Sequence, residues 1–555
     1  MEEILLNKPG KKLVLLGNEA IIRGALEAGV NFVSTYPGTP ASEIGNVFLR
    51  IARATNICFE FSINEKVALE AAAGASFSGL RSLVAFKHFG MNVASDSLIP
   101  LAYTGVEGGM VILVADDPNC WSSAQSEQNS RAYSYLTHLP TLEPSDPQEC
   151  KDFTKLAFQI SEKFKIPVII RTTTRVSHQK AGVILGRLPK IKRKLGNFLK
   201  NPERFSTMPP GIFRLKREML EKIEKLKEFS EKSEINLIKN QEMRNKELGI
   251  ITSGISYLYS MEAQRELNLN LPILKLGFFY PLPERKIKNF IRKLKKVLIV
   301  EELEGYLEKE IERLARVSNP RLKIFGKNLI TQVGELHPED VIFALGKFSG
   351  KKFKFPKIDL SFPRRLPRLC PNCPYWFVIS AVKKAVNEKE VIFGGDIGCY
   401  MIFRHWPIQL QDYLSCMGSS IGLAHGIKKV TKQKLITFIG DSTFLHAGIP
   451  ALINTVFNKS NPLIIILDNR TTAMTGHQPH PGAALRLDSF YQMTGELPGA
   501  VKIEEIVASC GVRNFKVIDP KNQKEMVKTI KEFLRKDEVS VIIARGVCAL
   551  LGKEE

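Results

Sequence analysis

The chain has 555 residues, 44% of them hydrophobic and 25% charged, a length that predicts roughly three or four domains and a composition that excludes a small disulfide scaffold, a collagen and a disordered tail. Its 79 Lys and Arg against 57 Asp and Glu give a net charge of +22, which raises the question of a nucleic-acid or anionic-membrane surface. No apolar run reaches the roughly 18 residues of a membrane span and the first apolar run is too short for a signal peptide, so we expect a cytoplasmic protein.

Residues 1–180 alternate short β-branched runs with Gly- and Ala-rich helical stretches. The runs include VLLG, MVILVADD and IPVIIRTTT, each four to nine residues long. Apolar runs of this length separated by amphipathic helices predict a parallel sheet covered on both faces. We therefore expect one doubly wound α/β domain over this range.

The rest of the chain divides by composition. Residues 181–246 are basic and Lys/Glu-rich at helical spacing, which predicts a solvated helical linker. Residues 247–346 resume the α/β pattern, 347–368 form a basic, Pro-rich connector, and 369–555 make a third α/β block. The fold class predicted is α/β, with three doubly wound parallel-sheet domains.

Two predicted strands of the third block end in polar residues at neighbouring positions. Gly440, Asp441 and Ser442 follow the first strand, and after 25 further residues the second strand ends at an Asp-Asn pair that includes Asn469. This pattern resembles the diphosphate-binding signature of thiamine diphosphate enzymes. Asp441, Asn469 and the backbone carbonyl of Thr471 are suitable ligands for Mg²⁺, and the N-terminus of the helix after Asp441 suits phosphate.

Longer sequence segments strengthen this resemblance. GDSTFLHAGIPALINTVFNKS, LDNRTTAMTGHQPHPG, YPGTPASEI, LLGNEAIIRGALEAGV and GDIGCY closely resemble the large-subunit family of indolepyruvate ferredoxin oxidoreductases, within the thiamine diphosphate-dependent 2-oxoacid:ferredoxin oxidoreductase superfamily. The likeness runs through nearly the whole chain in order. It implies domains of the thiamine diphosphate-binding fold type: residues 1–180 would bind the pyrimidine, 247–346 would be transketolase C-terminal-like, and 369–555 would bind the diphosphate.

The resemblance also implies roles for residues of the first block. Glu65 matches the glutamate that holds N1' of the aminopyrimidine and so promotes loss of the C2 proton, a role that an apolar surround favours. Glu70, one helical turn on, is the competing carboxylate. Thr39 would hydrogen-bond the carboxylate of a 2-oxoacid, and Arg131 is a candidate for its bidentate partner.

In the third block the resemblance adds Gly395 and Asp396, in GDIGCY, as residues that bind the cofactor. His477 and His480, which directly follow the Mg²⁺ loop, are candidate proton carriers, and His446 is a weaker one. A histidine in such a loop is more often only exposed or structural.

Nine cysteines are too few for a disulfide framework in a chain of this length. By the resemblance, Cys370, Cys373, Cys399 and Cys548 would hold one four-iron, four-sulfur cluster near the thiamine ring. A tetrahedral zinc site and no metal at all are the alternatives, and Cys416 is the alternative fourth ligand.

The function that the resemblance implies is oxidative decarboxylation of aryl-pyruvates such as indolepyruvate and phenylpyruvate to acyl-CoA, with electrons passed to ferredoxin. The family ordinarily continues into a ferredoxin-like module, whereas this sequence stops at Glu555. We therefore expect a smaller partner subunit in a hetero-oligomer, with coenzyme A and ferredoxin as the other partners. Alternatives are a non-oxidative decarboxylase, an oxidoreductase for another 2-oxoacid, and a degenerate scaffold subunit.

The positive charge is concentrated in the linker, in helix faces and in the connector, away from the motifs that contain the candidate cofactor and substrate residues. No zinc finger, aromatic RNA-binding motif or helix-turn-helix signature accompanies it. We expect a solvated Lys/Glu surface that can also steer acidic ferredoxin and coenzyme A, with neither nucleic acid nor membrane as a partner.

Overall fold

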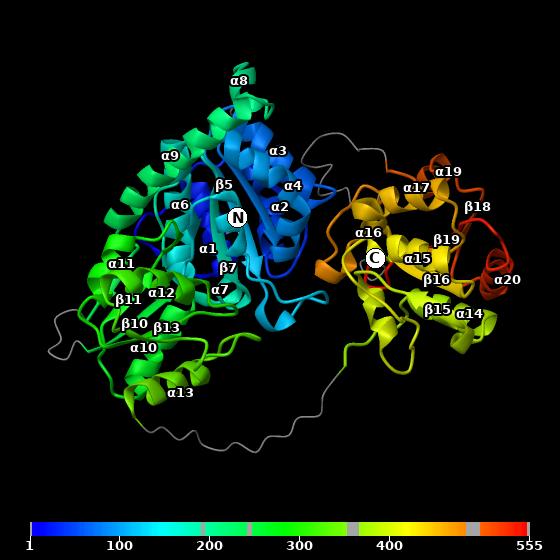
Figure 1. Ribbon diagram of the computed structural model, residues 1–555. Coiled ribbons are helices and arrows are strands. Elements are labelled where there is room, and N and C mark those ends of the chain that lie inside the picture. Colours follow the sequence, from blue (N-terminus) through cyan, green and yellow to red (C-terminus); the bar gives the residue numbers. More distant parts are fainter. Residues whose placement is uncertain (1–2, 190–194, 241–246, 352–365, 484–499, 552–555) are drawn as a thin grey trace. The chain divides into compact units, whose positions relative to one another are not determined.

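The computed structural model describes residues 3–189, 195–240, 247–351, 366–483 and 500–551. The chain forms two compact units, residues 1–357 and 358–555, which are described separately (Figure 1). Most of the predicted basic connector, 347–368, lies outside the described residues.

The first unit contains a seven-stranded sheet in the order β12-β6-β7-β5-β4-β2-β3. All neighbouring pairs are parallel except β12 with β6. Every position of β4, β5 and β7 is buried, because helices cover both faces and leave no solvated side on which polar residues would alternate. The strands are β2 (Phe32–Thr35), β3 (Cys58–Phe61), β4 (Ser82–Lys87), β5 (Met110–Asp116), β6 (Thr141–Leu142), β7 (Val168–Thr173) and β12 (Phe278–Tyr280).

Helices precede, connect and follow the parallel strands of this sheet along the chain. They are α1 (Gly17–Glu27), α2 (Ser42–Thr55), α3 (Glu65–Phe77), α4 (His88–Thr104), α5 (Ala132–Thr137), α6 (Pro147–Phe164) and α7 (Thr174–His178). A short antiparallel pair, β1 (Lys12–Leu16) with β8 (Lys180–Ile184), joins the start of this region to its end. Strands and helices alternate in chain order, as the sequence predicts.

The predicted solvated linker contains a packed helix. In α9 (Gly211–Lys232) the residues Leu215, Met219, Ile223 and Leu226 are buried, and α9 packs against α4. Their spacing of three or four residues gives one apolar stripe on a helix in which most of the other positions are Lys, Arg or Glu. The predicted solvated linker thus contains a helix with one buried face, which the charged majority of its residues concealed in the sequence.

A second sheet in the same unit has the order β14-β13-β10-β11-β9, with only β9 antiparallel. Its helices α11 and α12 pack together, as do α10 and α13. The elements are β9 (Leu237–Lys239), β10 (Leu248–Ser253), α10 (Ser256–Glu266), β11 (Ile273–Leu276), α11 (Glu284–Ile291), β13 (Lys296–Val300), α12 (Tyr306–Ser318), β14 (Lys323–Phe325) and α13 (Pro338–Ser349). The chain leaves this sheet at β12 to complete the edge of the first one, and then returns.

The second unit is one parallel sheet in the order β15-β16-β17-β19-β18. Helices α14 and α20 pack together, as do α15 and α17. The elements are α14 (Tyr375–Ala385), β15 (Val391–Gly394), α15 (Ser419–Val430), β16 (Lys434–Gly440), α16 (Asp441–Thr443), α17 (Ile449–Phe457), β17 (Leu463–Asp468), α19 (Ile503–Ser509), β18 (Asn514–Ile518), α20 (Gln523–Phe533) and β19 (Ser540–Arg545). The α/β fold class with parallel sheets is thus confirmed.

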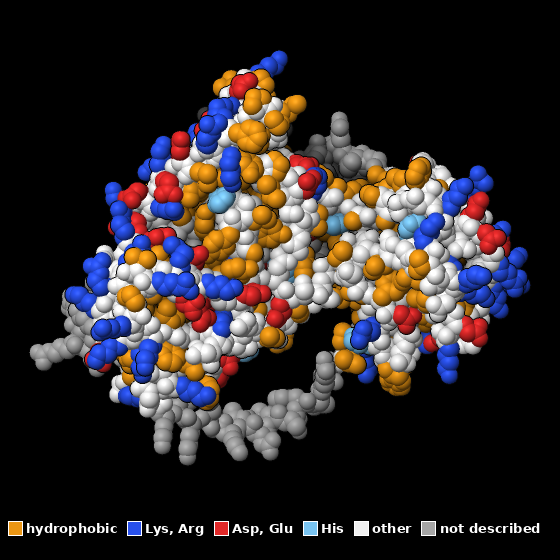
Figure 2. Space-filling model, in the orientation of Figure 1, with side chains coloured by type: hydrophobic (Ala, Val, Ile, Leu, Met, Phe, Trp, Pro, Cys, Tyr) orange, Lys and Arg blue, Asp and Glu red, His pale blue; other side chains and the backbone are white. Residues whose placement is uncertain are grey.

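The surface carries both positive and negative side chains rather than charges of one sign. On the face of the first unit drawn in Figure 2, basic side chains lie interspersed with acidic ones. Among the described residues, no helix combines the length and the apolar character that crossing a membrane requires.

Candidate functional site

Glu65 is the first residue of α3, directly after β3 at the carboxyl edge of the first sheet. The side chain of Asn64 caps this helix by accepting a hydrogen bond from the backbone N–H of Val67. Glu65 is only 7% exposed. Glu70 is exposed and accepts a hydrogen bond from the Ser97 hydroxyl. Burial therefore favours Glu65 over Glu70 as the carboxyl group that hydrogen-bonds a bound ligand.

The first turn of α4 lies against the Glu65 side chain. A Cβ built on Gly90 would lie 2.5 Å from Cγ and 3.0 Å from Oε1 of Glu65, and 2.8 Å from Cβ of Phe86. A glycine is thus required at position 90 for α4 to approach this closely. The backbone of α4 consequently holds the Glu65 carboxyl group at the sheet edge.

Thr39 lies in the loop between β2 and α2, at the same edge of the sheet, with its hydroxyl 3.3 Å from that of Ser42. The neighbouring Gly38 lies against the aliphatic stem of Lys87, since a Cβ on Gly38 would meet Cβ, Cγ and Cδ of that lysine at 3.3–3.4 Å. Lys87 is the last residue of β4. Our sequence prediction missed it, although a lysine between a buried strand and a helix was a usable signal.

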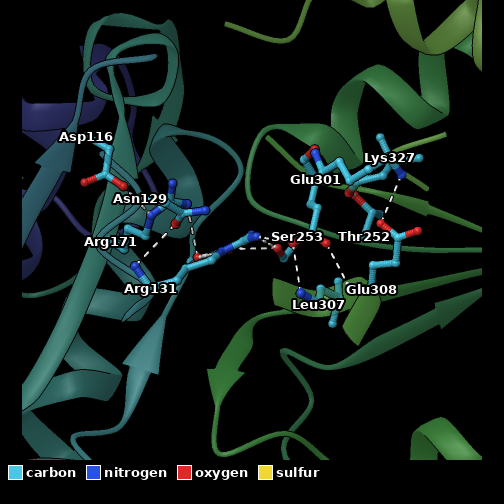
Figure 3. Close-up of polar contacts among 12 residues, drawn as sticks. Asp116, Asn129, Arg131, Arg171, Thr252, Ser253, Glu301, Leu307, Glu308 and Lys327 are labelled. Atoms are coloured by element: carbon cyan, nitrogen blue, oxygen red, sulfur yellow. Dashed lines mark hydrogen bonds and ion pairs between the residues drawn. The ribbon is translucent and has the colours of Figure 1, made fainter. Parts of the chain in front are cut away.

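Arg131 is nowhere available to a substrate in this structure. Its guanidinium is 2% exposed and forms a bidentate pair with Glu143, from Nε to Oε1 at 2.7 Å and from Nη2 to Oε2 at 2.6 Å. Nη1 donates to Glu301 at 2.5 Å and Nη2 also donates to Ser253 at 2.6 Å (Figure 3). The fork that would clasp a substrate carboxylate clasps protein carboxylates instead, which argues against the predicted role.

This cluster links the two sheets of the first unit. Arg171 on β7 donates to Asp116 at 2.7 Å and to Glu143 at 3.1 Å, while Glu301 follows β13 of the second sheet (Figure 3). Burial opposes ionisation of Glu143, but Arg131 and Arg171 outweigh it and lower its pKa to about 2. Glu143 is therefore ionised, and the arginines serve the architecture of the unit.

Neighbouring Glu302 differs. Burial raises its pKa to about 7, and the charge of Arg171 offsets this only in part. Of its two oxygens, Oε1 accepts a hydrogen bond from the backbone N–H of Leu336 at 3.3 Å. Glu302 thus titrates near neutral pH, and burial raises the pKa of Glu301 as well.

In the second unit, β16 and β17 pair in parallel register and bring their polar ends together. Asp441 is 2% exposed, and it accepts hydrogen bonds from the backbone N–H groups of Ser442 and Arg470, both at 2.8 Å. His480 Nε2 lies 3.2 Å from Oδ2 of Asp441. The turn after β17 is thereby fastened onto the aspartate after β16.

The same corner supplies hard oxygen donors. Asn469 and Thr471 are 6% and 4% exposed, and the Thr471 hydroxyl has no hydrogen-bond partner among the described residues. The Asp441 carboxylate, the Asn469 amide oxygen and the Thr471 backbone carbonyl are the donor types that Mg²⁺ prefers. These residues fit a magnesium ion bound to a diphosphate, and the N-terminus of α16 beside them suits the anion.

Asp396, in the turn after β15, has a structural task. Its carboxylate accepts hydrogen bonds from the backbone N–H groups of Ile397, Gly418 and Ser420 at 2.7–2.9 Å. It so fixes the start of α15 against this turn. Gly395 lies beside the Gln411 side chain, since a Cβ built on Gly395 would lie 2.4 Å from Cδ of Gln411. Asp396 therefore shapes the corner through its hydrogen bonds to the backbone.

The helix after Asp441 is irregular. Between α16 and α17, residues Phe444–Gly448 form one π-helical turn that contains the buried His446. Such turns recur at functional sites because they widen a helix locally. His477 lies in the loop after β17 with φ of +61°, and its backbone N–H donates to the carbonyl of Thr472. His480, in the same loop, lies beside Asp441.

The four predicted cluster cysteines form one electrostatic neighbourhood. Burial raises the pKa of the Cys373 thiol to about 12, and Cys399, Cys548 and Cys370 each add to the shift. Burial likewise raises the pKa of Cys399 to about 11, with Cys548 and Cys370 adding. The backbone N–H of Cys548 donates to the carbonyl of Asn469, so these cysteines adjoin the corner formed by Asp441, Asn469 and Thr471. Cys416 is exposed.

Within the part of the chain that the structure describes, no three His, Cys, Asp or Glu side chains converge as one metal ion requires. A tetrahedral zinc ion needs such convergence of its ligands. This lack of convergence holds for the four predicted cluster cysteines, all of which are described, so their geometry does not distinguish zinc from an iron–sulfur cluster.

Two family descriptions match separate parts of the chain. Residues 23–243 match "Pyruvate flavodoxin/ferredoxin oxidoreductase, thiamine diP-bdg". Residues 381–544 match "Thiamine pyrophosphate enzyme, C-terminal TPP binding domain". The first range contains Glu65 and Lys87, and the second contains Asp441, Asn469 and Thr471.

Relatives match nearly the whole chain. It is 44% identical over 558 aligned positions to indolepyruvate oxidoreductase subunit IorA of Methanothermobacter marburgensis, covering 99% of this chain and 89% of that protein. The same subunit of Pyrococcus horikoshii is 42% identical, with 99% and 87% covered. A solved 2-oxoglutarate:ferredoxin oxidoreductase from Magnetococcus marinus shares the fold over 60% of this chain and 65% of its own, at a TM-score of 0.50 and 16% identity. The chain belongs to the family of indolepyruvate oxidoreductase subunit IorA and is a catalytic, thiamine diphosphate-binding oxidoreductase subunit.

Proposed function

We propose that this subunit catalyses the oxidative decarboxylation of aryl-pyruvates, such as indolepyruvate and phenylpyruvate, to the corresponding acyl-CoA. The electrons pass to ferredoxin, and a smaller partner subunit completes a hetero-oligomer. The relatives' printed name supports the indole-bearing acid as the substrate class.

One observation carries the cofactor assignment. Asp441, Asn469 and Thr471 place three hard oxygen donors in one buried corner beside a helix N-terminus. Magnesium and a diphosphate together satisfy such a corner, since the cation needs oxygen ligands and the anion needs N–H donors. When bound, thiamine diphosphate supplies the electron sink that lets carbon dioxide leave a 2-oxoacid.

The chain's own residues bind and move protons around that group. Glu65 holds N1' of the aminopyrimidine ring, because its buried carboxyl group is fixed by α4 at the sheet edge. Thr39 hydrogen-bonds the substrate. His480, whose Nε2 lies 3.2 Å from Oδ2 of Asp441, is the nearer proton carrier, and Asp441 would be one of the residues that hold the magnesium ion. His477, in the same loop, is the second proton carrier.

We further propose that Cys370, Cys373, Cys399 and Cys548 bind one four-iron, four-sulfur cluster that receives the electrons. Their mutual charge interactions and the hydrogen bond of Cys548 to Asn469 support this, because thiolate sulfurs are the ligands of such a cluster. Binding requires that the protonated thiols lose their protons, so assembly is favoured at higher pH.

Non-oxidative decarboxylation is the rival reaction, since the same residues would serve it. The test is anaerobic turnover of phenylpyruvate by the assembled complex with thiamine diphosphate, Mg²⁺, coenzyme A and ferredoxin, with acyl-CoA and aldehyde measured together. Acyl-CoA formed in step with reduced ferredoxin is the expected result. Aldehyde without ferredoxin reduction would show the rival reaction instead.

Iron and acid-labile sulfide, measured on anaerobically purified protein, test the cluster. We expect about four of each per chain. A Cys370→Ser/Cys373→Ser double variant should lose both while a Cys416→Ser control keeps them. Equal iron in both variants would rule out the assigned ligands.

A further inference from the structure

Lys87 is a buried ammonium that the protein only partly satisfies. Its side chain is 11% exposed. Nζ donates one hydrogen bond, to the backbone carbonyl of Ser122 at 3.0 Å, and lies 3.9 Å from Oδ2 of Asp117 and 5.2 Å from the centroid of the Phe89 ring. An ammonium has three donors, so two have no hydrogen-bond acceptor among the described residues.

Asp117 does not complete this ammonium. Its Oδ2 accepts hydrogen bonds from the Ser122 N–H at 2.8 Å and the Ser123 hydroxyl at 2.6 Å, and its Oδ1 accepts one from Thr174 at 2.7 Å. These shorter contacts occupy the carboxylate. A buried cation with spare donors costs free energy unless an anion joins it, and this imbalance favours an anionic ligand.

The position of Lys87 identifies which part of a ligand would reach it. Its stem packs on Gly38, the residue before Thr39. Its charge also interacts with that of Glu65. Lys87 thus lies at the edge of β4, between the loop that carries Thr39 and the helix start that carries Glu65, where the reacting end of a 2-oxoacid belongs.

We propose that the Lys87 ammonium binds the carboxylate of the 2-oxoacid substrate. The inference rests on the proposed function and fills the role for which Arg131 is unavailable, since Glu143 and Glu301 occupy the Arg131 guanidinium. A lysine here also distinguishes an acid from its neutral amide, because only the acid compensates the buried charge.

The charge state of Lys87 gives the site a pH dependence. Burial lowers its pKa to about 8, and the charges of Asp117, Cys120 and Glu65 offset this only in part. His88 is the titratable neighbour on its own chain segment, and its pKa is lowered by burial, so it is neutral in this range. Substrate carboxylate should bind to the ammonium below pH 8 and lose this partner as the pH rises above it.

The experiment compares wild type with Lys87→Met, Lys87→Arg and a control, Lys225→Met, whose lysine is exposed on α9. Calorimetry on the assembled complex measures binding of 3-phenylpropanoate and of its neutral amide, and turnover gives KM for phenylpyruvate. We expect Lys87→Met to weaken carboxylate binding and raise KM about ten- to a hundredfold, with amide binding unchanged. Lys87→Arg should restore most of the affinity and remove its decline above pH 8, because arginine stays charged.

Binding of thiamine diphosphate and the melting temperature report whether each variant is folded. Equal carboxylate affinity in wild type and in a folded Lys87→Met would overturn the inference, whether or not the complex turns over phenylpyruvate. Loss of carboxylate binding in that variant, together with a wild type that oxidises no aryl-pyruvate, would keep the carboxylate site and overturn the proposed function.

Discussion

At the residue scale, two glutamates on one helix differ in what surrounds them. Glu65 is buried beneath the first turn of α4, whereas Glu70 is exposed and hydrogen-bonded to Ser97. Both are compatible with the helix, so the sequence offers them as rivals. Only the packing of α4 separates a carboxyl group that can hold a ring nitrogen from one that water solvates.

We predict that Glu65→Gln lowers turnover by at least about a hundredfold, because the amide cannot exchange a proton with N1' as a carboxyl group does. Exchange of the thiamine C2 proton with deuterium, followed by NMR on the loaded protein, should slow in parallel. Cofactor affinity should fall far less. Glu70→Gln serves as the control and should leave both measurements unchanged; normal exchange in Glu65→Gln would refute the assignment.

At the scale of elements, helix α4 positions the first unit's site. Its N-terminus follows Lys87 without a loop, and its third residue, Gly90, touches Glu65. A strand end and a helix start therefore place a cation and a carboxyl group from different elements at one edge. The space for this approach exists because position 90 has no side chain.

Gly90→Ala should lower the melting temperature and the turnover, since its Cβ would overlap Cβ of Phe86 as well as the Glu65 side chain. Overpacking of this kind costs about 1–3 kcal/mol. Gly74→Ala on α3 is the matched control, because a Cβ there meets nothing within 4 Å. It should be neutral or stabilise by about 0.5–1 kcal/mol through helix propensity. Equal effects of the two changes would contradict the packing argument.

At the scale of the whole molecule, buried charges join the two sheets of the first unit. Arg131 and Arg171 come from the first sheet's region, and Glu301 and Glu302 follow β13 of the second. Glu143 and Glu302 differ in charge state. Two arginine partners keep Glu143 ionised, whereas the pKa of Glu302 is about 7. The unit's stability should therefore depend on pH near neutrality.

The sign of that dependence follows from Glu302. Its folded-state pKa is above the ordinary value of 4.5, so the folded chain binds the proton more tightly than the unfolded chain does. Its contribution is full below pH 4.5 and is lost as the pH rises to about 7. A shift of this size corresponds to about 3 kcal/mol at most.

Glu302→Gln should remove this loss, because its neutral amide retains an oxygen that can accept from Leu336. We expect its melting temperature, relative to wild type, to rise between pH 5 and pH 7.5. Glu312→Gln, an exposed substitution on α12, controls for the change in net charge and should show no such trend. A pH-independent difference for Glu302→Gln would mean that Glu302 stays ionised in the fold.

Local patterns in the sequence carry much of this protein's structure and chemistry. Apolar runs between amphipathic helices predict the parallel sheets, because period and length are local properties. The motifs that contain Asp441 and Asn469 predict that these two residues lie close together, because parallel strands end at the same edge of a sheet. Strands β16 and β17 do pair in parallel. The family resemblance also rests on sequence motifs alone.

Tertiary structure decides matters that involve partners distant in the chain. Arg131 and Glu301 are 170 positions apart, so no local pattern shows that the guanidinium is already occupied. The apolar stripe of α9 has meaning only against α4, and the spare donors of Lys87 are recognised only once Asp117 is seen to bond elsewhere. Sequence determines which residues are able to perform the chemistry; burial and long-range hydrogen bonds decide which of them are free to do so, because desolvation and pairing depend on the whole fold.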